Sequence, residues 1–171
     1  MDLDERVTVV PYDEQWPLLF EMEKEKLRRV FADDAVDIRH FGSTAVPGMA
    51  AKPIIDILVG VGTLELDSAI TNRLAELGYE GFGEAGVPGR LYFRKRREHA
   101  FNLAVVIRNG EHWTNNLRIR DYLRRNPEAA RQYSEQKMNA IRSGHTTLLA
   151  YSDAKAGCVA RLLELAKQDS G

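Results

Sequence analysis

Gly42-Ser43 and Asp56 form the clearest chemical signal in the sequence: a tight polar turn followed by a carboxylate inside an apolar run. A Gly-Ser turn can present backbone N–H groups and a hydroxyl to a phosphate. Asp56 interrupts the run Ile54 to Val59, where an unpaired charge is costly, so we expect it to meet a cation, a metal ion or water in a cleft. This combination is typical of nucleotidyl transfer, although only one of its usual carboxylates is visible. The alternative is an ordinary turn beside a buried, hydrogen-bonded aspartate.

Two basic residues flank this signal. Lys52 stands just before the apolar strand and can reach a phosphate at the same strand end, while a solvated surface lysine is the alternative. His40 precedes Gly42 by two residues and can face the same ligand. The other three histidines have no mutual spacing typical of a zinc site.

A second group of candidates surrounds the glycine-rich stretch 83–89. Glu84 can complete a Mg²⁺ site begun by the aspartate, and Arg90 can grip a phosphate through two hydrogen bonds. Arg90, Arg94 and Arg96 are separated by even numbers of residues, so on a strand their side chains share one face. We expect this row of arginines to form a wall for an anionic ligand. A flexible hairpin with solvated edge-strand charges is the alternative.

Two helical segments add further basic residues. Arg120 is an i,i+4 neighbour of both Asn116 and Arg124, so one helix face can present positive charge toward the sheet. An ordinary polar helix face is the alternative. The segment Tyr151 to Lys155 has the composition of a helix start, with Lys155 as a secondary candidate for phosphate.

Hydrophobic periodicity predicts the elements that position these residues. Strands are expected at 7–10, 35–41, 54–61, 90–96 and 100–107. Helices are expected at 14–31, 65–77, 111–125, 127–142 and 147–168. The order predicts an α+β or α/β fold, in which a mixed sheet of about five strands packs with helices and a helical C-terminal part follows at about 111–168. No repeat, low-complexity stretch or linker divides the chain, so we expect a single domain over 1–171.

Composition limits the partners. The 171 residues carry 24 Lys and Arg against 25 Asp and Glu, a formal net charge of −1, which argues against bulk nucleic-acid binding but leaves room for a local basic site. A single cysteine, Cys158, excludes a disulfide framework and a cysteine-rich zinc site. The acidic start does not resemble a signal peptide, and no segment reaches the ~20 apolar residues of a membrane span. We therefore expect a cytoplasmic protein without membrane or nucleic-acid partners, while self-association stays open.

Several motifs together resemble the GrpB family, from residue 7 to about residue 165. They are Val9 to Asp13 with Trp16-Pro17, His40 to Gly48, Lys52 to Ile57, Gly83-Glu84 with Gly89-Arg90, and Arg120 to Arg124. The resemblance implies a nucleotidyltransferase-like fold of the DNA polymerase beta superfamily. It also implies a tie to coenzyme A metabolism, since a GrpB domain is fused to dephospho-CoA kinase in some bacteria.

Two departures from these patterns matter. The superfamily places a second carboxylate two residues after the aspartate, where this chain has Leu58. GrpB relatives typically carry a His-Leu-His-Val strand, which aligns here with Asn102 to Val105, so both histidines are absent. Asn102 stands instead among the candidate phosphate-binding residues.

The leading hypothesis is a protein that binds a nucleotide or another phosphorylated small molecule and transfers a nucleoside monophosphate with Mg²⁺. In it, Gly42 and Ser43 hold the distal phosphates, Asp56 ligates Mg²⁺, and further basic residues offset the charge on the transferring group. A non-catalytic ligand-binding or regulatory module is the alternative, and a metal-dependent phosphohydrolase is a third. The missing second carboxylate weakens transfer more than binding.

Overall fold

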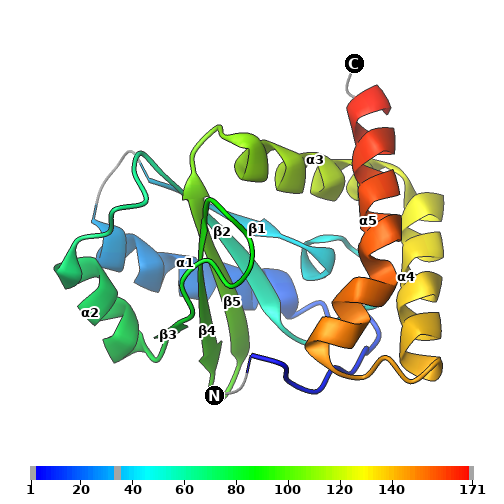
Figure 1. The fold of residues 1–171 in the computed structure, drawn as a ribbon, viewed down its shortest axis with the longest axis horizontal. Coiled ribbons are helices and arrows are strands. Elements are labelled where there is room, and N and C mark those ends of the chain that lie inside the picture. Colours follow the sequence, from blue (N-terminus) through cyan, green and yellow to red (C-terminus); the bar gives the residue numbers. More distant parts are fainter. Residues whose placement is uncertain (1–2, 33–35, 170–171) are drawn as a thin grey trace.

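A mixed sheet of five strands lies at the centre of the computed structural model, which describes residues 3–32 and 36–169 (Figure 1). The strands are β1 (Asp37–Phe41), β2 (Ile55–Val61), β3 (Glu80–Gly81), β4 (Arg90–Arg96) and β5 (Ala100–Ile107). Their order across the sheet is β1-β2-β5-β4-β3, with β2 and β5 parallel and every other neighbouring pair antiparallel. β2 is therefore hydrogen-bonded on both sides, as its apolar sequence predicts.

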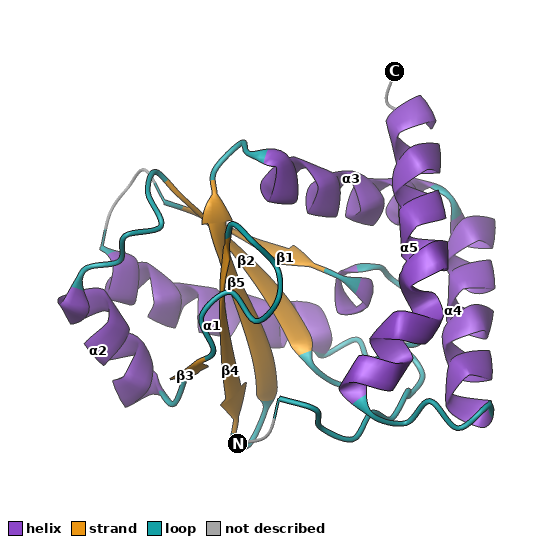
Figure 2. Cartoon of the chain, in the orientation of Figure 1, coloured by secondary structure: helices purple, strands orange, loops and turns teal. Residues whose placement is uncertain are grey.

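Helices cover both faces of this sheet (Figure 2). They are α1 (Trp16–Phe31), α2 (Ser68–Leu77), α3 (Glu111–Arg125), α4 (Pro127–Arg142) and α5 (Leu148–Asp169), together with the short 3-10 turn η1 (Ser43–Ala45). The α1 and α2 helices pack on one face, and α3 lies over the other. The α4 and α5 helices stand side by side at one end of the molecule, in contact with α3.

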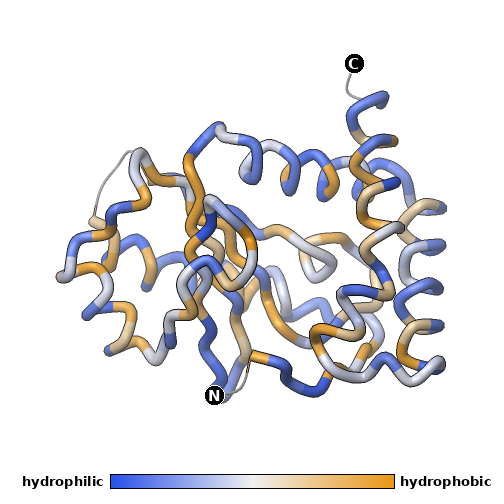
Figure 3. The backbone as a smooth tube through the Cα atoms, in the orientation of Figure 1, coloured by the Kyte–Doolittle hydropathy of each residue, from blue (hydrophilic) through white to orange (hydrophobic). Residues whose placement is uncertain are grey.

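Alternation along β2 separates two apolar layers. Ile57 and Val59 belong to the large core that also contains residues of α1 and α2, whereas Leu58 packs on the opposite face with Trp113 of α3. Because successive side chains of a strand point to opposite faces, Asp56 shares the α3 face with Leu58. Figure 3 shows the apolar colour along the central strands, while the helices alternate between polar and apolar stretches.

The N-terminal segment 3–10 runs from β4 to the C-terminal helices. The Arg94 guanidinium donates a hydrogen bond to the Leu3 carbonyl at 2.7 Å. At the first turn of α5, the Leu148 N–H donates to the Glu5 carbonyl at 2.7 Å. The segment therefore joins the sheet to the last helix.

The predicted strand at 7–10 is wrong. Val10 forms an isolated bridge with Ala51, and the ladder does not extend because Pro11 has no N–H to donate and Ala51 lies in a loop. The fifth strand of the sheet is the two-residue β3, which pairs with β4.

The other predicted elements are confirmed to within three residues at their ends, and the fold class is confirmed. The predicted start of the first sheet strand, at Ala35, falls outside the described residues. The α5 helix begins at Leu148, so the segment Tyr151 to Lys155 lies inside this helix and is not its start. Over the described ranges, no helix combines the length and the apolar character needed to cross a membrane.

Candidate functional site

A cavity of about 190 Å³ opens between the end of the sheet and the C-terminal helices. Its walls come from η1, the loop before β2, the start of β2, and helices α3, α4 and α5. The polar side chains that line it are Ser43, Thr44, Lys52, Asp56, Asn116, Arg120, Tyr133, Lys137, Tyr151 and Lys155. Five of the ten predicted site residues lie here, namely Gly42, Ser43, Lys52, Asp56 and Arg120.

The Gly42 backbone is shaped around Asp56. Gly42 has a φ of +71°, and a Cβ at this position would lie 2.5 Å from Oδ2 of Asp56. Only glycine therefore lets the turn approach the carboxylate this closely. The other carboxylate oxygen, Oδ1, accepts a hydrogen bond from the Asn102 amide at 3.0 Å, and the Asn102 oxygen accepts one from Arg96 at 2.7 Å.

Lys137 reaches the cavity from α4 and is the most buried of its cations, with 1% of its surface exposed. Its ammonium group donates to the Ser43 hydroxyl at 2.8 Å and to the Ala50 carbonyl at 2.6 Å, and it lies 4.7 Å from the centre of the Tyr133 ring. Burial, together with the positive charges of Lys155 and Lys52, lowers its pKa to about 7.

Lys155 reaches the same cavity from α5. Its Nζ lies 4.8 Å from the centre of the Tyr151 ring. Burial and the nearby Lys52 lower the pKa of Lys155 to about 8. The Tyr151 side chain is 1% exposed, and within the described residues its hydroxyl has no hydrogen-bond partner. A buried hydroxyl without a protein partner is unusual in a native fold, and this one can hydrogen-bond to a water molecule or a ligand atom in the cavity.

The charge around the cavity is strongly positive. Among its described lining residues, three lysines and one arginine face a single lining carboxylate, that of Asp56, and Arg120 is also paired with Asp121 at 2.8 Å. Desolvated cations without matching carboxylates are unstable unless an anion joins them. The three lysines therefore give the cavity the charge that suits an anion.

A repeated pattern in the sequence could have revealed the two cavity lysines of α4 and α5. Tyr133 to Lys137 reads Tyr-Ser-Glu-Gln-Lys, and Tyr151 to Lys155 reads Tyr-Ser-Asp-Ala-Lys. The two segments share their tyrosine, serine and lysine. On a helix, positions i and i+4 share one face, so each pattern places a tyrosine and a lysine side by side.

His40 lies behind the η1 turn and does not line the cavity. Its ring stacks on Phe20 at 4.9 Å, and its Nε2 lies 2.8 Å from the Thr44 hydroxyl. Burial, with the charges of Arg124 and Arg120, lowers the pKa of His40 to about 4, so it is neutral at pH 7. The sequence led us to expect His40 to face the ligand. In the structure its ring instead contacts the Thr44 hydroxyl and holds that side chain in place.

The arginines of β4 lie on one sheet face, as predicted, but their hydrogen bonds are made within the protein. Arg94 is completely buried and donates to the Tyr92 hydroxyl at 2.8 Å as well as to the N-terminal segment. Arg96 forms an ion pair with Glu5 at 2.6 Å. Arg90 donates to loop carbonyls and lies 4.7 Å from the Tyr92 ring centre. These arginines therefore bind acceptors of the chain itself. Neither Arg90 nor Arg94 lines the cavity.

Glu84 does not join Asp56. Its carboxylate accepts a hydrogen bond from the Gly89 N–H at 2.8 Å, within an exposed loop outside the cavity. The position two residues after Asp56 is held by Leu58, which is fully buried against Trp113. Among the described residues, no group of three or more His, Cys, Asp or Glu side chains is placed to hold a metal ion. The donor set does not fit a two-metal centre, because such centres need clustered carboxylates.

The sequence matches the family described as GrpB protein over residues 6–165. It is 34% identical to glutamate-rich protein GrpB of Alkalihalophilus pseudofirmus over 92% of this chain and 94% of that protein. It is also 34% identical to UPF0157 protein YqkA of Bacillus subtilis over 95% of this chain, but it spans only 48% of that relative. The chain belongs to the GrpB family.

One solved structure agrees with this assignment. The crystal structure of conserved protein GrpB from Enterococcus faecalis aligns with a TM-score of 0.86 and 29% identity, over 95% of this chain and 99% of that one. Cid1 poly(U) polymerase aligns over 75% of this chain and 45% of its own, at 12% identity and a TM-score of 0.47, and nothing about activity follows from a likeness of that size. A dephospho-CoA kinase of Mycolicibacterium paratuberculosis matches 43% of this chain at 34% identity, over 19% of its own length.

Proposed function

We propose that this protein binds a nucleotide or another phosphorylated small molecule in the cavity between the sheet and helices α3 to α5. The observation that carries the proposal is the convergence of Lys52, Lys137 and Lys155 on a cavity lined by one carboxylate. Phosphate groups are the common metabolite groups that bring two negative charges and several acceptor oxygens to one point.

The donors around the cavity support phosphate in particular. The Ser43 hydroxyl and the Tyr151 hydroxyl come from opposite walls, and the lysine ammonium groups supply charge between them. Burial raises the pKa of Tyr151 above its usual value, so this hydroxyl keeps its proton and can donate it to an oxygen.

Transfer of a nucleoside monophosphate is less well supported than binding. Two-metal transfer needs at least two carboxylates near one another, and Asp56 stands alone among the cations of the cavity. The expectation that Asp56 ligates Mg²⁺ stays a prediction. A binding or regulatory module, whose link to coenzyme A metabolism is itself a proposal, fits these residues better.

The test is a calorimetric titration of the protein with inorganic phosphate, nucleoside mono- and triphosphates and phosphorylated coenzyme A precursors, with and without Mg²⁺. We expect at least one phosphorylated ligand to bind without Mg²⁺. Lys52→Met and Lys155→Met should each weaken binding by about tenfold, because a hydrogen bond to a charged group contributes about 1.5 kcal/mol or more. An affinity that exists only with Mg²⁺ and is lost in Asp56→Asn would instead favour metal-dependent transfer.

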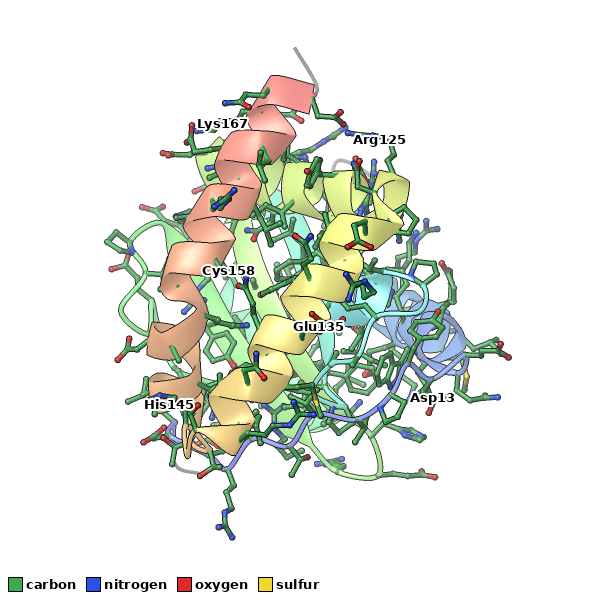
Figure 4. All side chains as sticks on the ribbon, turned by 90° about the vertical axis from the view of Figure 1, so that its right-hand side faces the viewer. Asp13, Arg125, Glu135, His145, Cys158 and Lys167 are labelled. Carbon is green, nitrogen blue, oxygen red and sulfur yellow. The ribbon has the colours of Figure 1, made fainter. Side chains whose placement is uncertain are left out.

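Lys167→Met is the matched control. Lys167 lies on the same helix as Lys155 but outside the cavity, and its Nζ is 3.7 Å from the Glu164 carboxylate. Figure 4 labels Lys167 toward the C-terminal end of α5, well beyond Cys158, which lies three residues after Lys155. Equal loss of affinity in Lys155→Met and Lys167→Met, or no binding of any phosphorylated ligand, would overturn the proposal.

A further inference from the structure

A short polar contact at the cavity joins a hydroxyl to a buried amine. The Nζ atom of Lys137 lies 2.8 Å from Oγ of Ser43, and the Ala50 carbonyl at 2.6 Å fixes the direction of the amine. The Tyr133 ring, 4.7 Å from the same Nζ, packs beside it. A hydroxyl within hydrogen-bond reach of an amine that a third group orients is the arrangement of an activated nucleophile and its base.

We propose that Ser43 is a phosphoryl acceptor and that Lys137 is the base that removes its proton. This inference rests on the proposed function, since it requires that the cavity first bind the phosphate of a phosphate monoester or a phosphoric anhydride. The product is a phosphoserine at position 43 and a released alcohol or acid.

The step balances without any other reactant. Oγ of Ser43 forms a bond to phosphorus, and the bond between phosphorus and the leaving oxygen breaks with its electron pair. The Ser43 proton passes to the neutral Lys137 amine and then to the leaving oxygen. Attack by water on the phosphoserine, with the same amine as base, would release inorganic phosphate and restore the hydroxyl.

The other groups around the cavity suit this step. Positive charge from Lys52, Lys155 and Arg120 can stabilise the equatorial oxygens of the transferring group, where charge gathers. The Tyr151 hydroxyl, unpartnered within the described chain, can donate to one of them.

The protonation state of Lys137 follows from the groups that face it from each neighbouring element. They are Ser43 in η1, Lys52 in the loop before β2, Asp56 in β2, Tyr133 in α4, and Tyr151, Lys155 and Cys158 in α5. Burial and the two lysines favour the neutral amine, whereas Asp56 and Cys158 favour the charged one. A pKa of about 7 leaves a large neutral fraction at neutral pH, as a base requires.

The test is to incubate the whole protein with acetyl phosphate or p-nitrophenyl phosphate, quench in acid and locate the phosphate by mass spectrometry. We expect the adduct on Ser43, formed at a rate that rises as the pH passes through about 7. Ser43→Ala should form no adduct. Lys137→Arg keeps the positive charge, so it should still bind inorganic phosphate. Because the guanidinium stays protonated and cannot act as a base, the variant should form the adduct at least about 100-fold more slowly than the wild type. Its rate should not depend on pH near 7.

Lys137→Met is the second variant in case arginine does not fit the buried position, and circular dichroism confirms the folding of each variant. The inference is overturned if a donor that binds, as judged by calorimetry, neither leaves phosphate on Ser43 nor releases inorganic phosphate. It is equally overturned if Lys137→Arg and Lys137→Met, both folded, form the adduct at the wild-type rate. Failure of the proposed function is a separate result, because it would appear as the absence of binding in the wild-type protein.

Discussion

Two lysines of this protein are almost completely withdrawn from water, and their surroundings differ. Lys95, on the α1 side of the sheet, is 8% exposed, and both oxygens of the buried Glu23 carboxylate lie within 2.9 Å of its ammonium group. Lys137, on the α3 side, is 1% exposed and contacts a hydroxyl, a carbonyl and a tyrosine ring, but it forms no ion pair with a carboxylate of the described residues. One lysine has its counter-charge within the fold, whereas the other would receive it from the ligand that we propose.

This difference separates structural charge from functional charge. A buried ion pair that is complete within the fold is a structural element, and removing one partner leaves an uncompensated charge. A buried amine without a carboxylate lowers the stability of the free protein, a cost that ligand binding can offset. The same reasoning applies to Arg94 and Arg96 of β4, whose ion pairs with Glu5 are made within the fold, as that of Lys95 is.

The largest expected effect comes from breaking the complete pair. Glu23→Gln should lower the free energy of unfolding by about 3–5 kcal/mol, because it leaves the Lys95 charge buried without its partner. At pH 7, Lys137→Met should change it by no more than about 1 kcal/mol, since the lost hydrogen bonds and the relieved burial of charge oppose each other. Urea unfolding measures both, with Glu21→Gln, exposed on the same helix, as the control. Equal losses in Glu23→Gln and Lys137→Met would contradict the comparison.

The second effect is the pH dependence of the free protein. The pKa of Lys137 is about 7 when folded and rises to its ordinary value of 10.5 on unfolding, so the unfolded chain binds more protons between these values. Stability is therefore reduced below pH 7 and recovers as the pH rises. Relative to Lys137→Met, the wild type should gain about 2 kcal/mol between pH 7 and 9, from about 1.4 kcal/mol per pH unit at most. If the difference in free energy of unfolding between wild type and Lys137→Met did not change with pH, the pKa of Lys137 would not be lowered in the folded protein.

The third effect concerns the turn that places the Ser43 acceptor beside Lys137. Gly42→Ala and Gly48→Ala both put a Cβ on a residue of positive φ, +71° and +79°, but only the first meets a neighbour, Oδ2 of Asp56 at 2.5 Å. Gly42→Ala should therefore be about 1–2 kcal/mol less stable than Gly48→Ala in thermal or urea unfolding. Equal stabilities would mean that the turn does not need to approach the carboxylate.

The smallest effect is expected for the hydroxyl acceptor itself. Ser43→Ala removes one of two acceptors of the Lys137 amine and should lower the free energy of unfolding by about 1 kcal/mol. Ser134→Ala, on α4 and outside the cavity, should leave it unchanged or slightly raised, because alanine favours the helix. If Ser43→Ala lost as much free energy of unfolding as Glu23→Gln, the contacts of Lys137 would stabilise the fold as those of Lys95 do.

The sequence predicts the elements and one wall of the cavity, because those features are local. Gly42-Ser43, Lys52 and Asp56 lie within 15 residues of one another, and the strand that carries the aspartate follows from its apolar run. Lys137 lies 94 residues after Ser43 in the sequence. No local pattern predicts which face of its helix meets the sheet. The Tyr-Ser-acid-x-Lys pattern acquires its meaning only when α4 and α5 pack side by side.

Arg94 illustrates the opposite difficulty. Its spacing with Arg90 and Arg96 correctly predicts a shared strand face, yet the partner that occupies it is the Leu3 carbonyl, 91 residues away. Glu84 was expected near Asp56 because glycines allow a loop to bend toward a site. The loop instead closes on itself through the Gly89 N–H. Spacing predicts which face a side chain occupies, but its partner depends on tertiary packing.

The N-terminal segment has a consequence for how the protein is made. Residues 3–10 leave the ribosome before the sheet does, whereas the partner of the Glu5 carbonyl, the Leu148 N–H, follows after all five strands. Because a chain emerges from its N-terminus at a finite rate, the sheet can form before α5 exists, while the cavity cannot close until α5 has emerged. The cavity is therefore completed only when α5 docks late onto a sheet that is already in place.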